Sequence, residues 1–429
     1  MSAVLIISFL VTLVIGVPIA ITLGLSTLAA VLYDGRFPAM VIPQRFFAGL
    51  DSFPLLAIPF FLLSAELMSG GRLTDVLLRF ASACVGHMRG GLGHANILTM
   101  TFFSGISGSA LADAAGPGSI IAKMMRETGY SPGYAAAMTA SAAIVGPIIP
   151  PSIIMVIYAL TDNSVSVTGL FLAGIVPGIM ISSALLAVNY WISVRRDYRS
   201  FEARPSWAEF AVITWRALPA LLLPLIILGG IHSGAFTPTE ASAVAVFYAW
   251  IAGRFVYRTL TLDKIPAILV RTAIMTASVM LIISTSDAFA WALTVLQIPQ
   301  AISEFIVSLG LGPIGFLIAV NIFLLLFGIF MEPLPGVMIL VPILAPVADA
   351  MDINSLQFAM VVILNLTLGM ITPPVGGLLF VTSLVTKVPM NALVRELWPL
   401  LGAEIVVLAL LTFVPGFSTW LPNAFGYLR

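Results

Sequence analysis

Charged side chains are scarce in this sequence. Only 9% of its 429 residues are Asp, Glu, Lys or Arg, against roughly 25% in an ordinary soluble protein. Nineteen acidic and nineteen basic side chains are too few to cover the surface of a water-soluble protein of this length. The chain is therefore predicted to be an integral membrane protein.

Cysteine and clustered basic residues are scarce as well. The single cysteine, Cys84, excludes an intrachain disulfide and a CxxC metal or redox pair. A net charge of zero without any basic block argues against a nucleic-acid partner, whose phosphates need clustered Lys and Arg.

Two further absences limit the chemistry of the chain. There is no GxxxxGK[ST] motif, so ATP hydrolysis is not expected. The three histidines, His87, His94 and His232, are too scattered for a metal site. We therefore expect neither a cofactor nor an enzymatic activity.

Long stretches carry no charge at all: 1–33, 128–161, 163–194, 217–239, 305–331 and 353–386. Each is long enough to cross a bilayer, which takes about 20 apolar residues. The first stretch lacks a basic n-region and is too long for a signal peptide, so it is predicted to be a transmembrane helix. We expect an all-α polytopic membrane protein with about 10 to 12 transmembrane segments.

The arginines mark the cytoplasmic side. One loop contains Arg195, Arg196, Arg199, Arg204 and Arg216, and a second cluster contains Arg254, Arg258, Lys264 and Arg271. By the positive-inside rule both are cytoplasmic, and the hairpin IHSGAFTPTE between them lies on the opposite side.

An internal repeat has an offset of 223 residues. GPIIPPS, beginning at Gly146, falls on GMITPPV, beginning at Gly369, and Gly105 falls on Gly328. Each copy contains an apolar arm, a small-residue tip and a helix broken at paired prolines. Lys123 and Arg126 close the first hairpin, whereas Asp349 and Asp352 close the second. This change of sign supports the hypothesis that the repeats are inverted, with two re-entrant hairpins entering from opposite faces.

Broken helices at membrane depth indicate a transport site. Irregular backbone survives there only when it is buried in protein or lines a wet cavity. Consecutive prolines at 150–151 and 373–374 remove amide donors and leave carbonyl oxygens unpaired. Such oxygens are hard ligands that suit a hard cation.

Polar side chains occur at both tips. Ser107, Ser109 and Asp113 lie in the first tip, and Glu332 lies in the second. An ionisable group at that depth is a functional candidate, because its burial is costly. Thr367 and Thr372 bracket the second break and offer hydroxyls that would complete a cation shell.

Three alternatives stay open at this point. GISG around Ser107 matches a short motif of intramembrane serine proteases, for which one of the histidines would have to supply the base. Coupling by protons through Asp113, Glu332 and Asp287 is a second alternative. A channel, which passes its substrate without a gradient, is the third.

Four motifs carry a family resemblance over essentially the whole chain: FFSGISGSALADAAGPGSI, GYAAAMTASAAIVGPIIPPSI, GGIHSGAFTPTEASAVA and GMITPPVGGLLFV. Together they resemble the large membrane subunit of a tripartite ATP-independent periplasmic (TRAP) transporter. The resemblance implies sodium-driven import of a small organic acid, such as a C4-dicarboxylate or sialic acid, across the bacterial inner membrane.

The resemblance also implies an elevator mechanism with a scaffold and a transport domain. The expected divisions are scaffold helices at 1–90, the first half of the transport domain at 91–165, scaffold helices and loops at 166–310, the second half of the transport domain at 311–388, and a C-terminal helix at 389–429. A periplasmic binding protein would deliver the substrate. Because no four-helix stretch precedes the first span, we expect a separate small membrane subunit on lipid-facing scaffold helices.

Site residues follow from the same resemblance. Sodium site 1 is predicted at Ser107, Ser109, Gly146, Ile149 and Pro151, and sodium site 2 at Gly328, Thr367, Gly369, Met370 and Thr372. The predicted substrate-binding residues are Asp113, Pro150, Glu332, Pro373 and Pro374.

Overall fold

Every regular element in the part of the chain that the structure describes is a helix. The computed structural model describes residues 1–68, 72–200, 203–308 and 310–427. Five helices in these ranges are long and apolar enough to cross a membrane, and a bent pair at Val41–Ala48 and Phe53–Met68 makes a sixth. The finding agrees with the predicted all-α membrane protein, in which several further helices are shorter.

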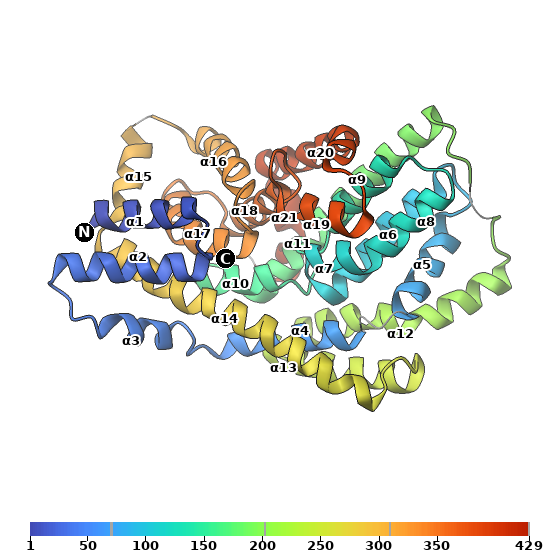
Figure 1. Ribbon diagram of the computed structural model, residues 1–429, viewed down its shortest axis with the longest axis horizontal. Coiled ribbons are helices and arrows are strands. Elements are labelled where there is room, and N and C mark those ends of the chain that lie inside the picture. The colour runs from blue at the N-terminus through green and yellow to red at the C-terminus, as the bar shows by residue number, and fades with distance from the viewer. Residues whose placement is uncertain (69–71, 201–202, 309, 428–429) are drawn as a thin grey trace.

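One group of helices forms a layer around the long helix α14 (Ile265–Val295), which we call the α14 layer (Figure 1). Helices α2, α3 and α4 pack directly on α14, α1 packs on α2, and α13 joins α4 to α12. The bounds in this layer are α1 Ser2–Ile15, α2 Ile19–Asp34, α3 Val41–Ala48, η1 Phe53–Leu56, α4 Ala57–Met68, α12 Trp207–His232, α13 Pro238–Ile251, η3 Ala252–Val256 and η4 Leu262–Lys264.

The first hairpin is formed by α6 (Gly91–Ser107) and α8 (Ser119–Glu127). They meet at a tip made of α7 (Ala110–Asp113) and the π-helix η2 (Ala114–Gly118). The hairpin packs against α9 (Pro132–Ala143), and after an irregular stretch the chain continues as α10 (Ile153–Thr161). The helix predicted to break at Gly146–Pro151 is therefore broken there.

The second hairpin repeats this order. Helices α16 (Pro313–Gly328) and α17 (Pro333–Ala350) are followed by α18 (Ser355–Gly369), a break, and α19 (Gly377–Thr386). The remaining helices are α5 Arg72–Val85, α11 Val167–Arg195, α15 Ile298–Ser308, α20 Met390–Phe413 and α21 Gly416–Ala424. Helix α20 packs against α9, α11 and α18, and so joins the two halves of the chain.

The two hairpins have their bases near opposite ends of α11, whose 29 residues span about 44 Å at about 1.5 Å per residue. Just after the end of α11, the carbonyl of Tyr198 accepts a hydrogen bond from the Gly90 amide, and its hydroxyl accepts one from the Ser131 amide. Near the beginning of α11, Ser164 and Ser166 share a cavity with Asn354 at the base of the second hairpin.

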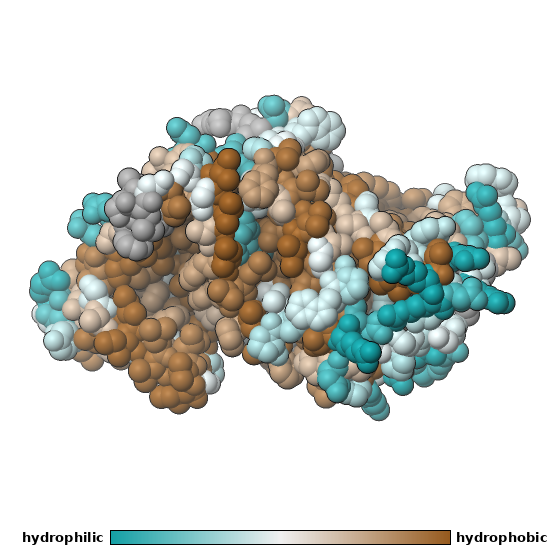
Figure 2. Space-filling model, turned by 90° about the horizontal axis from the view of Figure 1, so that it is seen from above, coloured by the Kyte–Doolittle hydropathy of each residue, from teal (hydrophilic) through white to brown (hydrophobic). Residues whose placement is uncertain are grey.

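Many large hydrophobic side chains are exposed on the surface. Figure 2 shows hydrophobic residues across the middle of the face in view and hydrophilic residues gathered at one end, where α8 and the beginning of α12 lie in Figure 1. Val14, Leu225 and Phe247 are each more than half exposed. In water this exposure would drive aggregation, so it indicates a lipid-facing surface.

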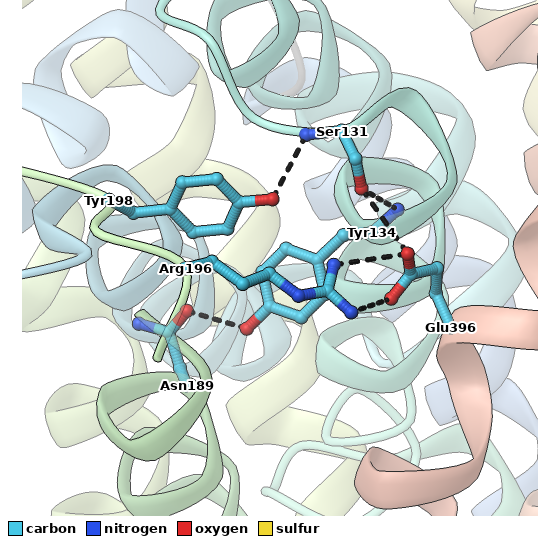
Figure 3. A network of polar contacts seen from close by, with 6 residues as sticks. All are labelled: Ser131, Tyr134, Asn189, Arg196, Tyr198 and Glu396. Carbon is cyan, nitrogen blue, oxygen red and sulfur yellow. Dashed lines mark hydrogen bonds and ion pairs between the residues drawn. The ribbon is translucent and has the colours of Figure 1, made fainter. Parts of the chain in front are cut away.

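A polar network ties α9, α11 and α20 together at the arginine-rich end (Figure 3). Two nitrogens of the Arg196 guanidinium donate to the Glu396 carboxylate at 3.0 and 2.7 Å, and these hydrogen bonds raise the pKa of Arg196 above its ordinary value. The guanidinium lies 5.5 Å from the ring centroid of Tyr134, whose hydroxyl donates to Asn189. A bidentate pair of this kind fixes geometry as well as charge.

The Arg196–Glu396 pair is testable with a double-mutant cycle. We expect Arg196→Ala and Glu396→Ala each to lower the free energy of unfolding by about 1–2 kcal/mol. Each substitution removes both charge-assisted hydrogen bonds and leaves the other residue of the pair without them. The double variant should lose less than the sum of the two, because both single changes remove the same interaction. Thermal unfolding of the detergent-solubilised protein measures this, and strict additivity would contradict the proposed pairing.

Two glycines bring α16 and α18 into backbone contact. A Cβ atom on Gly369 would lie 2.4 Å from the carbonyl carbon of Gly328, and one on Gly328 would lie 3.1 Å from the Gly369 Cα. No side chain fits between these helix ends, so the contact depends on glycine at both positions.

We expect Gly369→Ala to separate α16 from α18 and to lower the melting temperature by several degrees, because the added methyl meets backbone rather than a flexible side chain. Gly402→Ala is the matched control, since a Cβ at Gly402 in α20 has no atom within 4 Å. The control should be neutral or slightly stabilising. Equal melting temperatures for the two variants would show that the contact is not tight.

Candidate functional site

A cavity of about 320 Å³ lies between the two hairpin tips and the α14 layer; we call it the tip cavity. The first tip contributes Gly108–Leu111 and the second contributes Glu332–Leu334. The opposite wall consists of Leu62 and the α14 residues Ile274, Met275, Ser278, Val279 and Ile282. Two segments that are far apart in sequence therefore face each other across one site.

The lining of the tip cavity is apolar apart from a few groups. Glu332 is the one charged side chain among the described lining residues, and Ser109 and Ser278 supply hydroxyls. A mostly apolar pocket with few polar groups is typical of small-molecule sites. Helix α17 begins at this cavity, so the positive end of its dipole faces it.

Behind the first tip, Ser107 and Asp113 form a buried pair. The Ser107 hydroxyl donates to the Asp113 carboxylate, and the Ser109 amide donates to the Ser107 oxygen at 3.2 Å. Asp113 is fully buried, and its Oδ2 has no hydrogen-bond partner. The Ser107 hydroxyl therefore pairs with a carboxylate and not with a histidine base, which an intramembrane serine protease would need.

The tip closes onto the first helix break. A Cβ atom on Gly146 would lie 2.6 Å from Asp113 Oδ2, and one on Gly108 would lie 2.7 Å from the Pro151 carbonyl oxygen. Within the described residues, the carbonyl oxygens of Gly146, Ile149 and Pro151 accept no hydrogen bond. The residues predicted for sodium site 1 are thus brought together, and unpaired oxygens are present among them.

The residues predicted for sodium site 2 also gather at one place. The Thr367 hydroxyl donates to the Ile363 carbonyl at 2.6 Å, and the Thr372 hydroxyl donates to the Leu368 carbonyl at 2.8 Å. Both threonine oxygens keep lone pairs that are free to accept. Gly328 lies against Gly369, and the Met370 carbonyl accepts only one hydrogen bond, from Leu378.

The predicted substrate residues divide into two groups. Glu332 lines the tip cavity. Asp113 lies behind the tip, and Pro150, Pro373 and Pro374 lie in the breaks rather than among the lining residues. The peptide bonds Pro150–Pro151 and Pro373–Pro374 are both cis, so the two breaks have the same local backbone feature.

Nothing in the amino-acid sequence indicates the wall that α14 contributes. Ile274, Met275 and Ile282 belong to an evenly apolar helix, in which nothing marks the residues that face a cavity rather than lipid. Ser278 was equally unremarkable in sequence, because isolated serines are common in membrane helices and usually bond their own backbone. Ser278 does so here, donating to the Ile274 carbonyl.

Comparison with known proteins identifies the family to which the sequence is similar. Residues 6–417 match the family described as "Tripartite ATP-independent periplasmic transporter, DctM component". The sialic acid TRAP transporter large permease protein SiaM of Vibrio cholerae is 40% identical over 96% of each chain. The C4-dicarboxylate TRAP transporter large permease protein DctM of Pseudomonas aeruginosa is 41% identical over 94% of each chain.

The fold has a relative among solved structures. The YdaH transporter of Alcanivorax borkumensis aligns over 87% of each chain with a TM-score of 0.60 and 13% sequence identity, a likeness that concerns the fold alone. The relatives in sequence are transporter permeases and not enzymes. On the match to residues 6–417 and on these identities over nearly the whole length, the chain belongs to the DctM component family of the TRAP transporters, as a multi-pass membrane subunit.

Proposed function

We propose that this chain is a sodium-coupled secondary transporter subunit that imports a small organic acid across the bacterial inner membrane. The observation that carries the proposal is the pairing of two hairpin tips and two helix breaks around one cavity. Broken helices in corresponding places of a transporter supply carbonyl ligands for ions and helix ends for anions.

Each break offers oxygen ligands for one sodium ion. In site 1 the carbonyls of Gly146, Ile149 and Pro151 accept no hydrogen bond within the described residues, and the Pro151 carbonyl oxygen lies against Gly108 of the first tip. The Asp113 carboxylate borders Gly146, so we propose that it acts in this site, where its charge would balance the ion. Site 2 uses Thr367, Thr372 and the backbone of Gly328, Gly369 and Met370.

The tip cavity would hold the organic acid. Its described lining contains no basic side chain, so the substrate carboxylate would be met by hydroxyls, by the N-terminus of α17 and by the field of the two sodium ions. The names of the relatives mention sialic acid and C4-dicarboxylates, and we propose a substrate of this class.

Transport would follow from movement of the hairpins against the α14 layer. The hairpin bases near opposite ends of α11 support inverted repeats and re-entrant hairpins. Because α11 and α20 pack on α9 and α18, we assign both to the moving part, together with residues 91–165 and 311–388. This proposal takes α11 out of the scaffold range 166–310 and joins α20 of the separate range 389–429 to the transport domain. The family is tripartite, and we propose a separate small membrane subunit and a periplasmic binding protein as partners.

Sodium coupling is testable in proteoliposomes that contain this chain and its partner subunit. We expect Ser107→Ala and Thr367→Ala to reduce sodium-driven uptake at least about tenfold, as the loss of about 1.4 kcal/mol of ion binding would. Ser104→Ala and Thr382→Ala are matched controls, because both hydroxyls are buried and bond their own helix. Uptake that ignores sodium but fails when a proton gradient is collapsed would replace this proposal with the proton-coupled one.

The hairpin movement is testable by cross-linking in a Cys84→Ala background. Ser278 on the fixed α14 layer and Leu334 on the moving second hairpin both line the tip cavity, and each is replaced by cysteine. We expect a disulfide or a short bifunctional reagent to join them and to stop uptake, with recovery on reduction. Cysteines at Ser242 and Ala65, on two helices of the same fixed layer, serve as the control pair. Full uptake in the cross-linked protein would exclude a sliding hairpin.

A further inference from the structure

A second cavity, of about 370 Å³, follows the tip cavity along α14 toward the end of the molecule opposite the arginine-rich loops. Helix α14 lines it with Ser286 and Asp287, and the chain before α4 lines it with Gly49 and Ser52. The other side consists of residues 157–163, in and after α10, and of α17. We call it the Asp287 cavity. None of the residues predicted for the two sodium sites or for the substrate lines it, and Asp287 was named from sequence only for the proton-coupled alternative.

Two polar atoms on α14, one on a buried serine and one on a half-buried aspartate, are buried here without a hydrogen-bond partner in the described part of the chain. Ser286 is 2% exposed, and its hydroxyl makes no hydrogen bond. The Oδ2 atom of Asp287 is buried and also makes none. The backbone passes close to this carboxylate, because a Cβ on Gly49 would lie 2.6 Å from the Asp287 Cβ. Unpaired polar groups at this depth are costly unless something binds them.

Further oxygens open onto the same cavity from the opposite side. Thr161 donates its hydroxyl hydrogen to the Ile157 carbonyl at 2.9 Å, which leaves its oxygen lone pairs free. Asn163 and Ser52 also line the cavity, and their side chains make no hydrogen bond within the described residues. Carboxylate, hydroxyl and amide oxygens form a set of hard ligands.

Arg45 is the basic residue whose field reaches Asp287, but no ion pair within 4.0 Å joins them in the described part of the chain. The Arg45 guanidinium instead lies 5.5 Å from the ring centroid of Trp291, one turn beyond Asp287 on α14. The cavity is therefore lined by one negative charge and no positive charge. A single carboxylate suits a monovalent cation, whereas tight calcium sites use several.

We propose that the Asp287 cavity binds one sodium ion between α14 and the α10–α17 side, separate from the two ions of the helix breaks. Asp287 and Ser286 would hold it from the fixed wall, and Thr161 and Asn163 would hold it from the facing unit. If the α10–α17 side moves against the α14 layer as proposed above, these four residues surround one ion only in the arrangement of the two parts that this structure shows. Sodium bound here would then favour this arrangement over the alternative one.

Thermal stabilisation of the detergent-solubilised protein tests the site. Sodium chloride is titrated against choline chloride at constant ionic strength. The background is Ser107→Ala with Thr367→Ala, so that the ions of the breaks do not contribute. We expect the melting temperature still to rise with sodium, and Asp287→Asn to weaken the apparent sodium affinity at least about tenfold. Asp51→Asn, an exposed carboxylate nearby, is the control and should change nothing.

Ser286→Ala gives a second, milder variant in case Asp287→Asn does not fold. It should weaken the apparent sodium affinity several-fold, whereas Ser284→Ala on the same helix should not, because the Ser284 hydroxyl already donates to the Phe46 carbonyl. Unchanged sodium affinity in Asp287→Asn or Ser286→Ala would overturn the proposal. The readout is binding and not uptake, so a failure of sodium-driven transport would leave this result independently interpretable.

Discussion

The structure depends on one constraint, the need to satisfy backbone hydrogen-bonding groups inside a membrane. Lipid offers no partner to a carbonyl oxygen, so most of the described chain is helical. Two irregular stretches follow the hairpins. Ile144–Ser152 is buried at all but one residue, whereas Met370–Gly376 is partly exposed and its Met370 lines the tip cavity. Where the helical hydrogen bonding stops, backbone carbonyl oxygens are left without a partner and become available as ligands.

Small residues make these two breaks possible. Gly146 and Gly108 let the first tip approach the first break, and Gly328 and Gly369 do the same in the second half. Helix association in membranes relies on close packing, because apolar burial gives no advantage over lipid. The glycines that allow this close packing within each half are thus the residues around which the two sodium sites are proposed.

The membrane helices and the two helix breaks were predictable from the sequence. The scarcity of charge and the uncharged runs predicted the membrane helices, and the paired prolines at 150–151 and 373–374 predicted both breaks, because each effect is local in sequence. The position of Asp113 was harder to predict. Sequence placed it in the first tip, but only the fold shows that it points to Ser107 and Gly146 rather than into the tip cavity.

The wall of α14 and the Asp287 cavity lay beyond sequence reasoning. In a soluble helix the polar face shows which side is buried. In a membrane helix both sides are apolar, so nothing distinguishes Ile274 facing a cavity from an isoleucine facing lipid. Asp287 was visible as a titratable residue, but its neighbours come from three separate segments, around Gly49, Thr161 and Met338. Only tertiary structure brings these together.

The charge of the tip cavity gives the proposed coupling a physical basis. Glu332 is the one charged group among the described lining residues, so an organic anion that entered alone would meet a like charge in a largely apolar pocket, which is unfavourable. Cations held in the two breaks would reverse the sign of the local field. Substrate and ions would then bind well only together, and the empty or the fully loaded cavity would be the form that crosses the membrane with least electrostatic penalty. The proposed co-transport would then follow from the composition of a cavity whose described lining contains no basic residue.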